Sequence, residues 1–330
     1  MPVPESCQSR FHRRWDHLHD VHVRALAWML DAPDLLDADA PRWSGKIACL
    51  RIDRVEVAAW LGSLEKSPAA LHAFLNMSSV TRLGRYAEKL MAFYFGWCGT
   101  LVAHGLQVRA ENKETIGEFD FLLREGEALL HLEFATKFYL FEAGGEAPEN
   151  DPAHYFVGPN LADTLDAKMD KILNRQLALA RHPAALACLP QPVLRSQALV
   201  KGWLFYRQDH DLHSVAPGVA AAHCRGGWCS LADFANLAAE GFLLLPRLAW
   251  LAPARVAADD PVDLVRDHAA MTVWLQAHFA GDAMPVMMAM MEVDNDVARE
   301  VARCFVVPDD WRERAHERAQ RTVLRLGSGQ

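Results

Sequence analysis

The sequence predicts an α/β protein in which helices flank a mixed β-sheet. The chain has 330 residues, which suits one large domain or two smaller ones, and 51 % of them are hydrophobic, enough for a substantial core. In the middle of the chain the periodicity runs helix, strand, strand, strand, helix, strand. We therefore expect a helical N-terminal extension at residues 1–78, an αβββαβ core at residues 79–210, and an α+β extension packed on that core at residues 211–330.

The N-terminal extension is predicted to be mostly helical. Apolar residues recur every three or four positions between residues 15 and 30, as on the buried face of a helix. A break rich in Pro and Asp follows. The pattern then indicates a short strand at residues 48–52 and a helix at residues 55–64.

The predicted core begins with a helix at residues 79–97, which Ser78 or Ser79 can cap and Gly99 ends. Alternating or β-rich segments predict strands, the last two joined as a hairpin by the turn at residues 124–127. After a loop rich in Gly, Pro and Asn, a long helix ends before Pro183. Strands are expected at residues 107–110, 117–123 and 128–141. The loop is expected at residues 144–159, the helix at residues 160–181 and the final strand at residues 197–207.

The C-terminal extension is predicted to mix helices with a strand. Its apolar spacing indicates helices at residues 231–239, 263–279 and 295–304. A strand is expected at residues 285–293. The aromatic residues Trp203, Tyr206 and Trp228 can stack on bases, but side chains of this size are more often found in a core.

Composition narrows the classes of function. The net charge of −8 argues against a surface coated with Lys and Arg for non-specific DNA binding, so any nucleic-acid site needs local positive charge. No secretory signal or membrane-spanning apolar run is found, and we expect a soluble, cytoplasmic protein without membrane partners. The seven dispersed cysteines indicate free thiols; His223, Cys224 and Cys229 lack the usual spacing of zinc ligands, so buried thiols are the favoured interpretation there.

The predicted hairpin concentrates acidic residues and a lysine. Because side chains two apart on a strand share a face, Glu118 and Asp120 lie together, as do His131, Glu133, Ala135 and Lys137. Clustered carboxylates repel one another unless a cation neutralises them, and Mg²⁺ is held by one or two carboxylates plus water and phosphate oxygens. A nearby lysine can orient the attacking water and stabilise developing negative charge.

A plainer interpretation is that Glu118, Glu133 and Lys137 form the solvated face of an amphipathic hairpin. The surrounding sequence argues against it. Asp120 and Glu133 both lie within apolar runs, and strands this apolar are usually covered on both sides. Carboxylates buried there without partners would be costly.

The order of elements resembles the core of the PD-(D/E)XK nucleases, which have a restriction-endonuclease-like fold. The segment from Gly117 to Asp120, followed by a strand with Glu133 and Lys137, resembles the metal-binding motif of that superfamily. The resemblance implies a Mg²⁺- or Mn²⁺-dependent nuclease acting on DNA or RNA, with DNA favoured. It also implies that Glu88, on the preceding helix, joins Asp120 and Glu133 as metal ligands, and that Gln176 joins Asp120, Glu133 and Lys137 in catalysis.

The chain as a whole more closely resembles the bacterial family DUF1853. The matching segments are Gly-Glu-x-Asp-Phe at residues 117–121, Glu-x-x-x-Lys-Phe-Tyr-Leu at residues 133–140, and Gly-Pro-Asn at residues 158–160. This resemblance covers most of the chain and implies no particular function.

The sequence departs from the nuclease motif in one respect. The acid and the lysine usually lie two residues apart, whereas Ala135 stands between Glu133 and Lys137 and four residues of strand span about 13 Å. We interpret Lys137 as a lysine that has moved along the strand. A degenerate site on a nucleic-acid-binding or scaffold protein remains the alternative. A hydrolase using Ser or Cys is disfavoured, because no GxSxG motif is present.

The helix after the motif offers local positive charge. Lys168, Lys171 and Arg175 recur at three- and four-residue spacing and so share one face. This face can contact phosphates. The alternative is a solvated face on which the cations pair with Asp163, Asp166 and Asp170. The sequence leaves protein partners and oligomeric state open.

Overall fold

A single β-sheet forms the centre of the molecule. The computed structural model describes residues 5–143, 152–207, 216–257, 264–282, 284–294 and 297–318. These residues form an 11-stranded sheet in the order β1-β2-β3-β5-β6-β11-β10-β7-β9, with β4 beside β3 and β8 beside β11. The strands are β1 (Leu101–Arg109), β2 (Thr115–Glu125), β3 (Ala128–Phe141), β4 (Phe156–Val157), β5 (Val193–Tyr206), β6 (Cys224–Ser230), β7 (Gly241–Leu244), β8 (Arg255–Val256), β9 (Val265–Arg266), β10 (Val286–Asp294) and β11 (Val297–Val307).

The sheet is mixed, as the sequence predicts. The meander β1–β2–β3 is antiparallel, whereas β3 with β5, β5 with β6, and β6 with β11 are parallel pairs. The parallel connection from β3 to β5 runs through the helical segment that begins with α6, as parallel strands require a crossover. The described residues are thus a mixed α/β fold.

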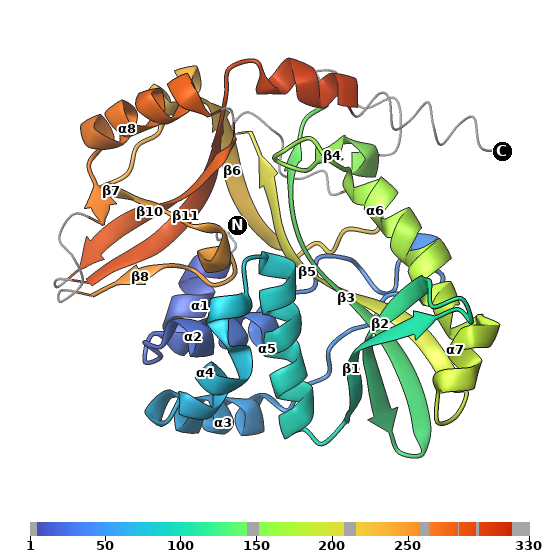
Figure 1. Cartoon of the computed structure of the whole chain (residues 1–330). Coiled ribbons are helices and arrows are strands. Elements are labelled where there is room, and N and C mark those ends of the chain that lie inside the picture. The colour runs from blue at the N-terminus through green and yellow to red at the C-terminus, as the bar shows by residue number, and fades with distance from the viewer. Residues whose placement is uncertain are drawn as a thin grey trace.

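Helices lie against both faces of the sheet. Figure 1 shows α1 to α5 (blue to teal) grouped on one side of β3 and β5, and α6 and α7 (green) on the other. A further helix occupies residues 311–318. The helices are α1 (Cys7–Trp15), α2 (Val21–Asp31), α3 (Arg54–Lys66), α4 (Ala69–Leu75), α5 (Leu83–Trp97), α6 (Leu165–Lys171), α7 (Pro183–Cys188) and α8 (His268–Gly281).

Aromatic side chains join the helices to the sheet. Trp28 of α2 stacks on Trp203 of β5 with ring centroids 6.1 Å apart, and Phe95 of α5 meets Phe121 of β2 at 5.2 Å. Trp203, Tyr206 and Trp228 are all buried, so core packing is confirmed for the three aromatics. Burial of such large rings supplies much of the hydrophobic stabilisation.

The central elements agree with the prediction in type and order. The helix before the sheet, the hairpin β2–β3 and the strand β5 are all present, and Gly99 takes a left-handed φ of 68° where α5 ends. The helix α5 begins at Leu83, later than predicted, because Ser79 belongs to a preceding 3₁₀ turn. Of the predicted loop at residues 144–159, the part up to residue 151 lies outside the described residues.

Three predictions of local structure were wrong. Residues 48–52 form no strand; only Ile47 makes a bridge, to Ala198. The single helix predicted at residues 160–181 is instead α6, a π-helical turn at Ile172–Gln176 and a 3₁₀ turn at Leu177–Arg181. Residues 15–30 hold the end of α1 and most of α2, because Asp20 caps a new helix with hydrogen bonds from His22 and Val23.

The predicted helix at residues 295–304 is also wrong where it is described, because β11 occupies residues 297–307. The segment contains two charged residues, Glu300 and Arg303. Both are buried and form an ion pair of 2.6 Å, while β10 and β6 pair with the strand on either side. The helix predicted at residues 231–239 is reduced to a 3₁₀ turn at Ala232–Asn236. Of the helix predicted at residues 263–279, α8 begins only at His268, and β9 occupies Val265–Arg266 before it.

The sheet runs through the boundaries proposed for the three parts of the chain. Strands β5 and β6 flank the boundary at residue 210 and are parallel neighbours. The N-terminal residue Ile47 pairs with Ala198 of the core. Residues 208–215 lie outside the described residues, and the division into three parts stays a prediction.

Among the helices of the described residues, none has the length and apolar character needed to cross a membrane.

Candidate active site

Strands β2 and β3 separate at the predicted motif. Their pairing runs from Glu125↔Ala128 to Phe121↔Leu132 and stops there, while β3 continues along β5 as far as Leu140. Asp120 and Glu133 are therefore the first residues beyond the paired hairpin. The carboxylate of Asp120 accepts a hydrogen bond of 2.9 Å from the backbone N–H of Phe134, which has lost its ladder partner on β2.

Glu133 lies between a histidine and a glutamine. Its side chain is buried, with Oε1 2.7 Å from Nε2 of His131 and Oε2 accepting a hydrogen bond of 2.5 Å from Nε2 of Gln176. The other ring nitrogen of His131 lies 3.2 Å from the hydroxyl of Ser196. Each carboxylate oxygen thus has one side-chain partner, His131 or Gln176, which holds Glu133 in one orientation.

Gln176 reaches the site from the π-helical turn Ile172–Gln176. The extra residue of a π-turn shifts the side chains that follow it, and such turns are frequent at functional sites. The Oε1 of Gln176 is buried and has no hydrogen-bond partner within the described part of the chain. An oxygen acceptor left unsatisfied beside Glu133 suits a group that donates hydrogen bonds, such as a metal-bound water.

Burial and neighbouring carboxylates raise the pKa of two acids of the site, Asp120 and Glu88. Burial, followed by the charge of Glu133, raises the pKa of Asp120 to about 8. Burial and then the charge of Glu118 raise the pKa of Glu88 to about 7, and Glu133 contributes to the same shift. Glu88 on α5 and the two strand residues therefore lie within electrostatic reach of one another. A divalent cation would favour the ionised carboxylates.

Lys137 lies farther along β3 from Glu133. Burial, together with the charges of Lys168 and Lys171, lowers the pKa of Lys137 to about 8, against the opposing charges of Asp163 and Glu88. Among the described residues, no hydrogen bond or ion pair joins Lys137 to Asp120 or Glu133. The structure thus places Lys137 near Glu88 and the lysines of α6.

The acids predicted to neutralise the helix after the motif have other partners. Asp163 accepts a hydrogen bond of 3.1 Å from the hydroxyl of Tyr139, and Asp170 accepts one of 2.6 Å from Asn174. Asp166 pairs with Arg42 at 3.1 Å and with His154 at 3.2 Å.

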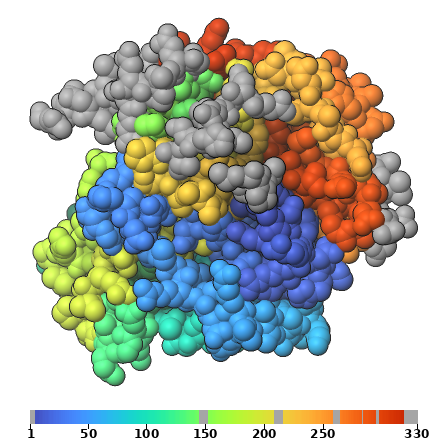
Figure 2. Space-filling model, turned by 180° about the vertical axis from the view of Figure 1, so that it is seen from behind, coloured from blue at the N-terminus to red at the C-terminus, as the bar shows by residue number. Residues whose placement is uncertain are grey.

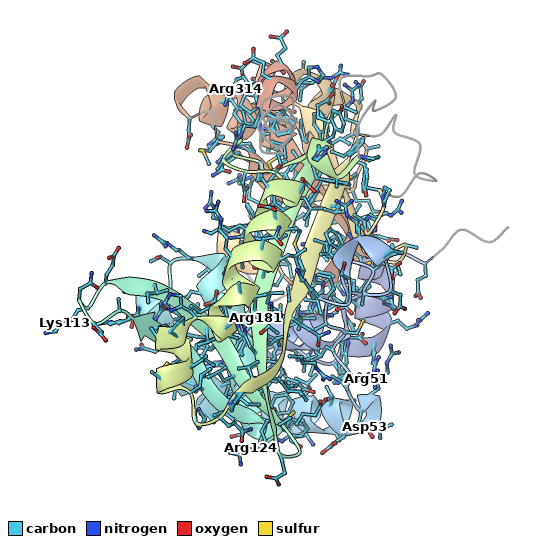
Figure 3. All side chains as sticks on the ribbon, turned by 90° about the vertical axis from the view of Figure 1, so that its right-hand side faces the viewer. Arg51, Asp53, Lys113, Arg124, Arg181 and Arg314 are labelled. Carbon is cyan, nitrogen blue, oxygen red and sulfur yellow. The ribbon has the colours of Figure 1, made fainter. Side chains whose placement is uncertain are left out.

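Positive charge from this helix therefore remains beside Lys137. Lys168 is half-buried, whereas Lys171 and Arg175 are exposed, and none of the three pairs with an acid within the described segments. Figure 3 shows α6 and the turns after it lying in front of the strands, with Arg181 on the side that faces the viewer. The pairing of these cations with Asp163, Asp166 and Asp170, which was the alternative, is not found among the described contacts.

The carboxylates do not form a closed metal cage. Within the described ranges, no three His, Cys, Asp or Glu side chains converge as a metal site, and this includes His223, Cys224 and Cys229. Both ring nitrogens of His223 have protein partners, Tyr206 and Ala220. Because Mg²⁺ and Mn²⁺ keep several waters and need only one or two carboxylates, Asp120 and Glu133 are the kind of donors that would suit either ion.

His131 and Ser196 were not assigned to the site from the sequence. His131 is two residues before Glu133 on β3, so the alternation of side chains along a strand is sufficient to predict that both lie on the same face. Ser196 could not be found that way. It stands opposite His131 only because β5 pairs with β3 in the register that places the two residues side by side.

Comparison with known proteins gives one match. A family model described as "Domain of unknown function (DUF1853)" matches residues 24–307. No curated protein and no solved structure matches the chain.

Proposed function

The chain belongs to the DUF1853 family, and we propose that it is a metal-dependent nuclease that hydrolyses phosphodiester bonds in DNA or RNA, with DNA favoured. The observation that supports this most is the grouping of Glu88, Asp120 and Glu133 at the point where β2 and β3 separate, where burial and neighbouring carboxylates raise the pKa of Glu88 and of Asp120. Buried acids whose pKa is raised in this way are typical of functional sites.

The order of elements adds support. The run α5, β1, β2, β3, α6, β5 resembles the restriction-endonuclease-like core of the PD-(D/E)XK enzymes. In that fold the acids of the hairpin stand beside an acid from the preceding helix, as Glu88 does here. We therefore propose the same superfamily for this chain.

Glu88, Asp120 and Glu133 would hold Mg²⁺ or Mn²⁺, which supplies Lewis-acid stabilisation of a phosphate and a water of lowered pKa. Gln176 and His131 fix the carboxylate of Glu133 and so preserve the orientation of its oxygens. Lys137, whose pKa of about 8 leaves it protonated at neutral pH, orients water or stabilises negative charge on the phosphate.

The nucleic-acid strand would lie along the basic face of α6 and the π-turn. Lys168, Lys171 and Arg175 provide phosphate contacts there, next to Lys137. Phosphate contacts position a strand without reading its sequence. Local charge of this kind is compatible with the net charge of −8 of the whole chain.

One observation favours a second function, a catalytically degenerate nucleic-acid-binding or scaffold protein. Lys137 contacts neither Asp120 nor Glu133 in the described structure, and Ala135 occupies the position nearer to the acids. If the lysine is required within reach of the cleaved phosphate, the site binds a strand without cutting it.

A cleavage assay separates these functions. We expect the purified protein to cleave single- or double-stranded DNA with Mn²⁺, and Asp120→Asn to lower the rate by at least about 100-fold, because an essential carboxylate oxygen is lost. The matched control is Glu111→Gln, which removes one exposed acid from the β1–β2 turn and should keep the wild-type rate. Equal activity in wild type and Asp120→Asn would refute the assignment of the site.

Metal binding is measured in parallel by thermal unfolding. We expect Mn²⁺ to raise the Tm of the wild type and of Glu111→Gln, and to raise that of Asp120→Asn much less, because a ligand stabilises only the state that binds it. A metal-dependent shift together with DNA binding but no cleavage would favour the degenerate binding protein.

A further inference from the structure

A second positively charged site lies among the N-terminal segments. A pocket of about 840 Å³ is formed by α1, the end of α2, residues 50–54 before α3 and the residue Lys201 of β5. Figure 2 shows the face of the molecule on which these N-terminal segments (blue) gather. The volume is within the range of small-molecule sites, roughly 300–1,000 Å³.

The lining of the pocket has an excess of cations. It contains six cationic side chains and only two acids, Asp31 and Asp34, in a chain whose net charge is −8. Like charges gathered in one hollow repel one another and focus a positive potential that attracts anions. The cations are Arg10, Arg13, Arg14, Arg51, Arg54 and Lys201.

Both acids of the pocket already form ion pairs. Asp31 pairs with Arg14 at 2.6 Å, and Asp34 pairs with Lys201 at 2.8 Å. Arg13 pairs with Glu5, which does not line the pocket, at 2.7 Å. The remaining three arginines, Arg10, Arg51 and Arg54, have no acidic partner within the described residues.

Lys201 provides a buried cation at the inner end of the pocket. Its side chain is 3 % exposed, and its ammonium group donates to the backbone oxygen of Ala32 at 2.6 Å besides pairing with Asp34. A buried ammonium is a strong binding group for an anion, because little solvent competes for it.

This pocket is separate from the proposed active site. In the register of β3 and β5, Thr136 stands opposite Lys201 and Lys137 stands opposite Gly202. Because neighbouring residues of a strand point to opposite faces, Lys201 and Lys137 lie on opposite faces of the sheet. The two sites share no residue.

We propose that the pocket binds the phosphate groups of a nucleotide or of a nucleic-acid end. Three unpaired arginines and a buried lysine match an anion with two or more charges, and guanidinium groups bind phosphate oxygens in pairs. The pocket also has an apolar part, Leu30, Leu50 and Ile52, which suits the organic portion of such a ligand better than free inorganic phosphate. The inference does not depend on nuclease activity.

The test is a calorimetric titration of the full chain with adenosine diphosphate, in a chelator that keeps metal ions away from the acidic site. We expect binding to the wild type that weakens with added salt, and at least a tenfold loss of affinity in the double variant Arg51→Glu/Arg54→Glu. Both arginines are exposed, so the variant should fold, which its circular dichroism would verify.

The matched control is Arg109→Glu/Lys113→Glu, which changes the net charge equally at the β1–β2 hairpin, on the opposite side of the molecule from Arg51 in Figure 3. It should change the affinity by less than twofold. A 5′-phosphorylated single-stranded oligonucleotide, titrated into the wild type and into Arg51→Glu/Arg54→Glu, identifies the source of the phosphate. Binding that is tighter than that of the diphosphate and that weakens in the variant indicates a strand end, and any other result with the oligonucleotide indicates a free nucleotide.

Failure of both probes to bind, or an equal loss in the control variant, would overturn the proposal. Asp120→Asn should bind adenosine diphosphate as the wild type does. Failure of this proposal and failure of the nuclease assignment are therefore distinguishable, because each site has its own variant and its own readout.

Discussion

Asp120 serves the fold and the proposed chemistry at once. Its carboxylate replaces the ladder partner that the N–H of Phe134 loses where β2 and β3 separate. The same carboxylate faces Glu133 and Glu88. A variant that keeps the shape and hydrogen-bond acceptor, such as Asp120→Asn, is therefore a better probe of chemistry than Asp120→Ala, which also leaves a buried N–H unpaired.

The titration of a single residue, His223, makes the stability of the folded protein depend on pH. Burial lowers the pKa of His223 to about 4, and the neutral ring bonds to Tyr206 and Ala220. Because the folded-state pKa lies below the unfolded value of about 6.5, stability from this group is full above pH 6.5 and is lost as the pH falls toward 4. We expect His223 to account for about 3 kcal/mol of the loss of unfolding free energy over that interval.

Urea denaturation at pH 7, 6, 5 and 4 measures this loss. Between pH 7 and pH 4 the unfolding free energy of His223→Gln should fall by about 3 kcal/mol less than that of the wild type, even if the variant is less stable at pH 7. The exposed residue His19 provides the control, since His19→Gln should follow the wild-type curve. Parallel curves for wild type and His223→Gln would contradict the expectation.

The site residues show what a sequence can and cannot predict. Strand periodicity is sufficient to place Asp120 and Glu133 on a hairpin, and the spacing along the strand predicts that Lys137 lies far from Glu133. Gln176 was expected beside the acids only from the resemblance to the PD-(D/E)XK nucleases. The partner Ser196 depends on the register of β5 against β3, which local spacing does not encode.

At the level of elements, Gly202 is required for the pairing of β5 with β3. It has a φ of 155°, and a Cβ there would overlap the backbone oxygen of Lys137. Gly202→Ala should therefore destabilise the protein by at least about 2 kcal/mol, because the backbone must shift or the pairing must break. The strand register next to Lys137 would change with it.

Gly62 is the contrasting case. It lies inside α3, where an added Cβ meets nothing within 4 Å. Gly62→Ala should stabilise the chain by about 0.5–1 kcal/mol, since alanine favours helix. Both variants are measured by urea denaturation, and equal effects of the two substitutions would show that the close approach at Gly202 is not a constraint.

Elements were predictable where local pattern and final environment agree. The helix α5 and the hairpin β2–β3 each have a clear period, and both are present. The strand β11 was missed because its buried Glu300 and Arg303 satisfy each other, so the charge pattern does not mark a solvent face. The π-turn was missed because it bonds like a helix and has no distinct sequence signal.

For the whole molecule, the continuous sheet predicts one cooperative unit. Phe205 of β5 packs on Phe305 of β11 at 4.7 Å, and Arg303 of β11 lies 3.9 Å from the ring of Trp203. A fragment of residues 1–207 would expose this surface and the edge of β5. We expect it to lack a cooperative unfolding transition, whereas the full chain unfolds in one transition by both circular dichroism and tryptophan fluorescence.

A fragment that unfolded cooperatively would instead support a core that folds without the C-terminal extension. Two separated transitions in the full chain would have the same meaning. Either result would locate a boundary near residue 210.

The parallel pairing of β6 with β11 also has a consequence for how the protein is made. β6 ends at Ser230, but its neighbour is complete only at Val307. A ribosome adds about 5–20 residues per second, so a nascent chain would present the open edge of β6 for on the order of ten seconds. We expect the yield of folded protein in cells to depend on translation speed and chaperone supply, because this interval is when neighbouring chains can pair with that edge.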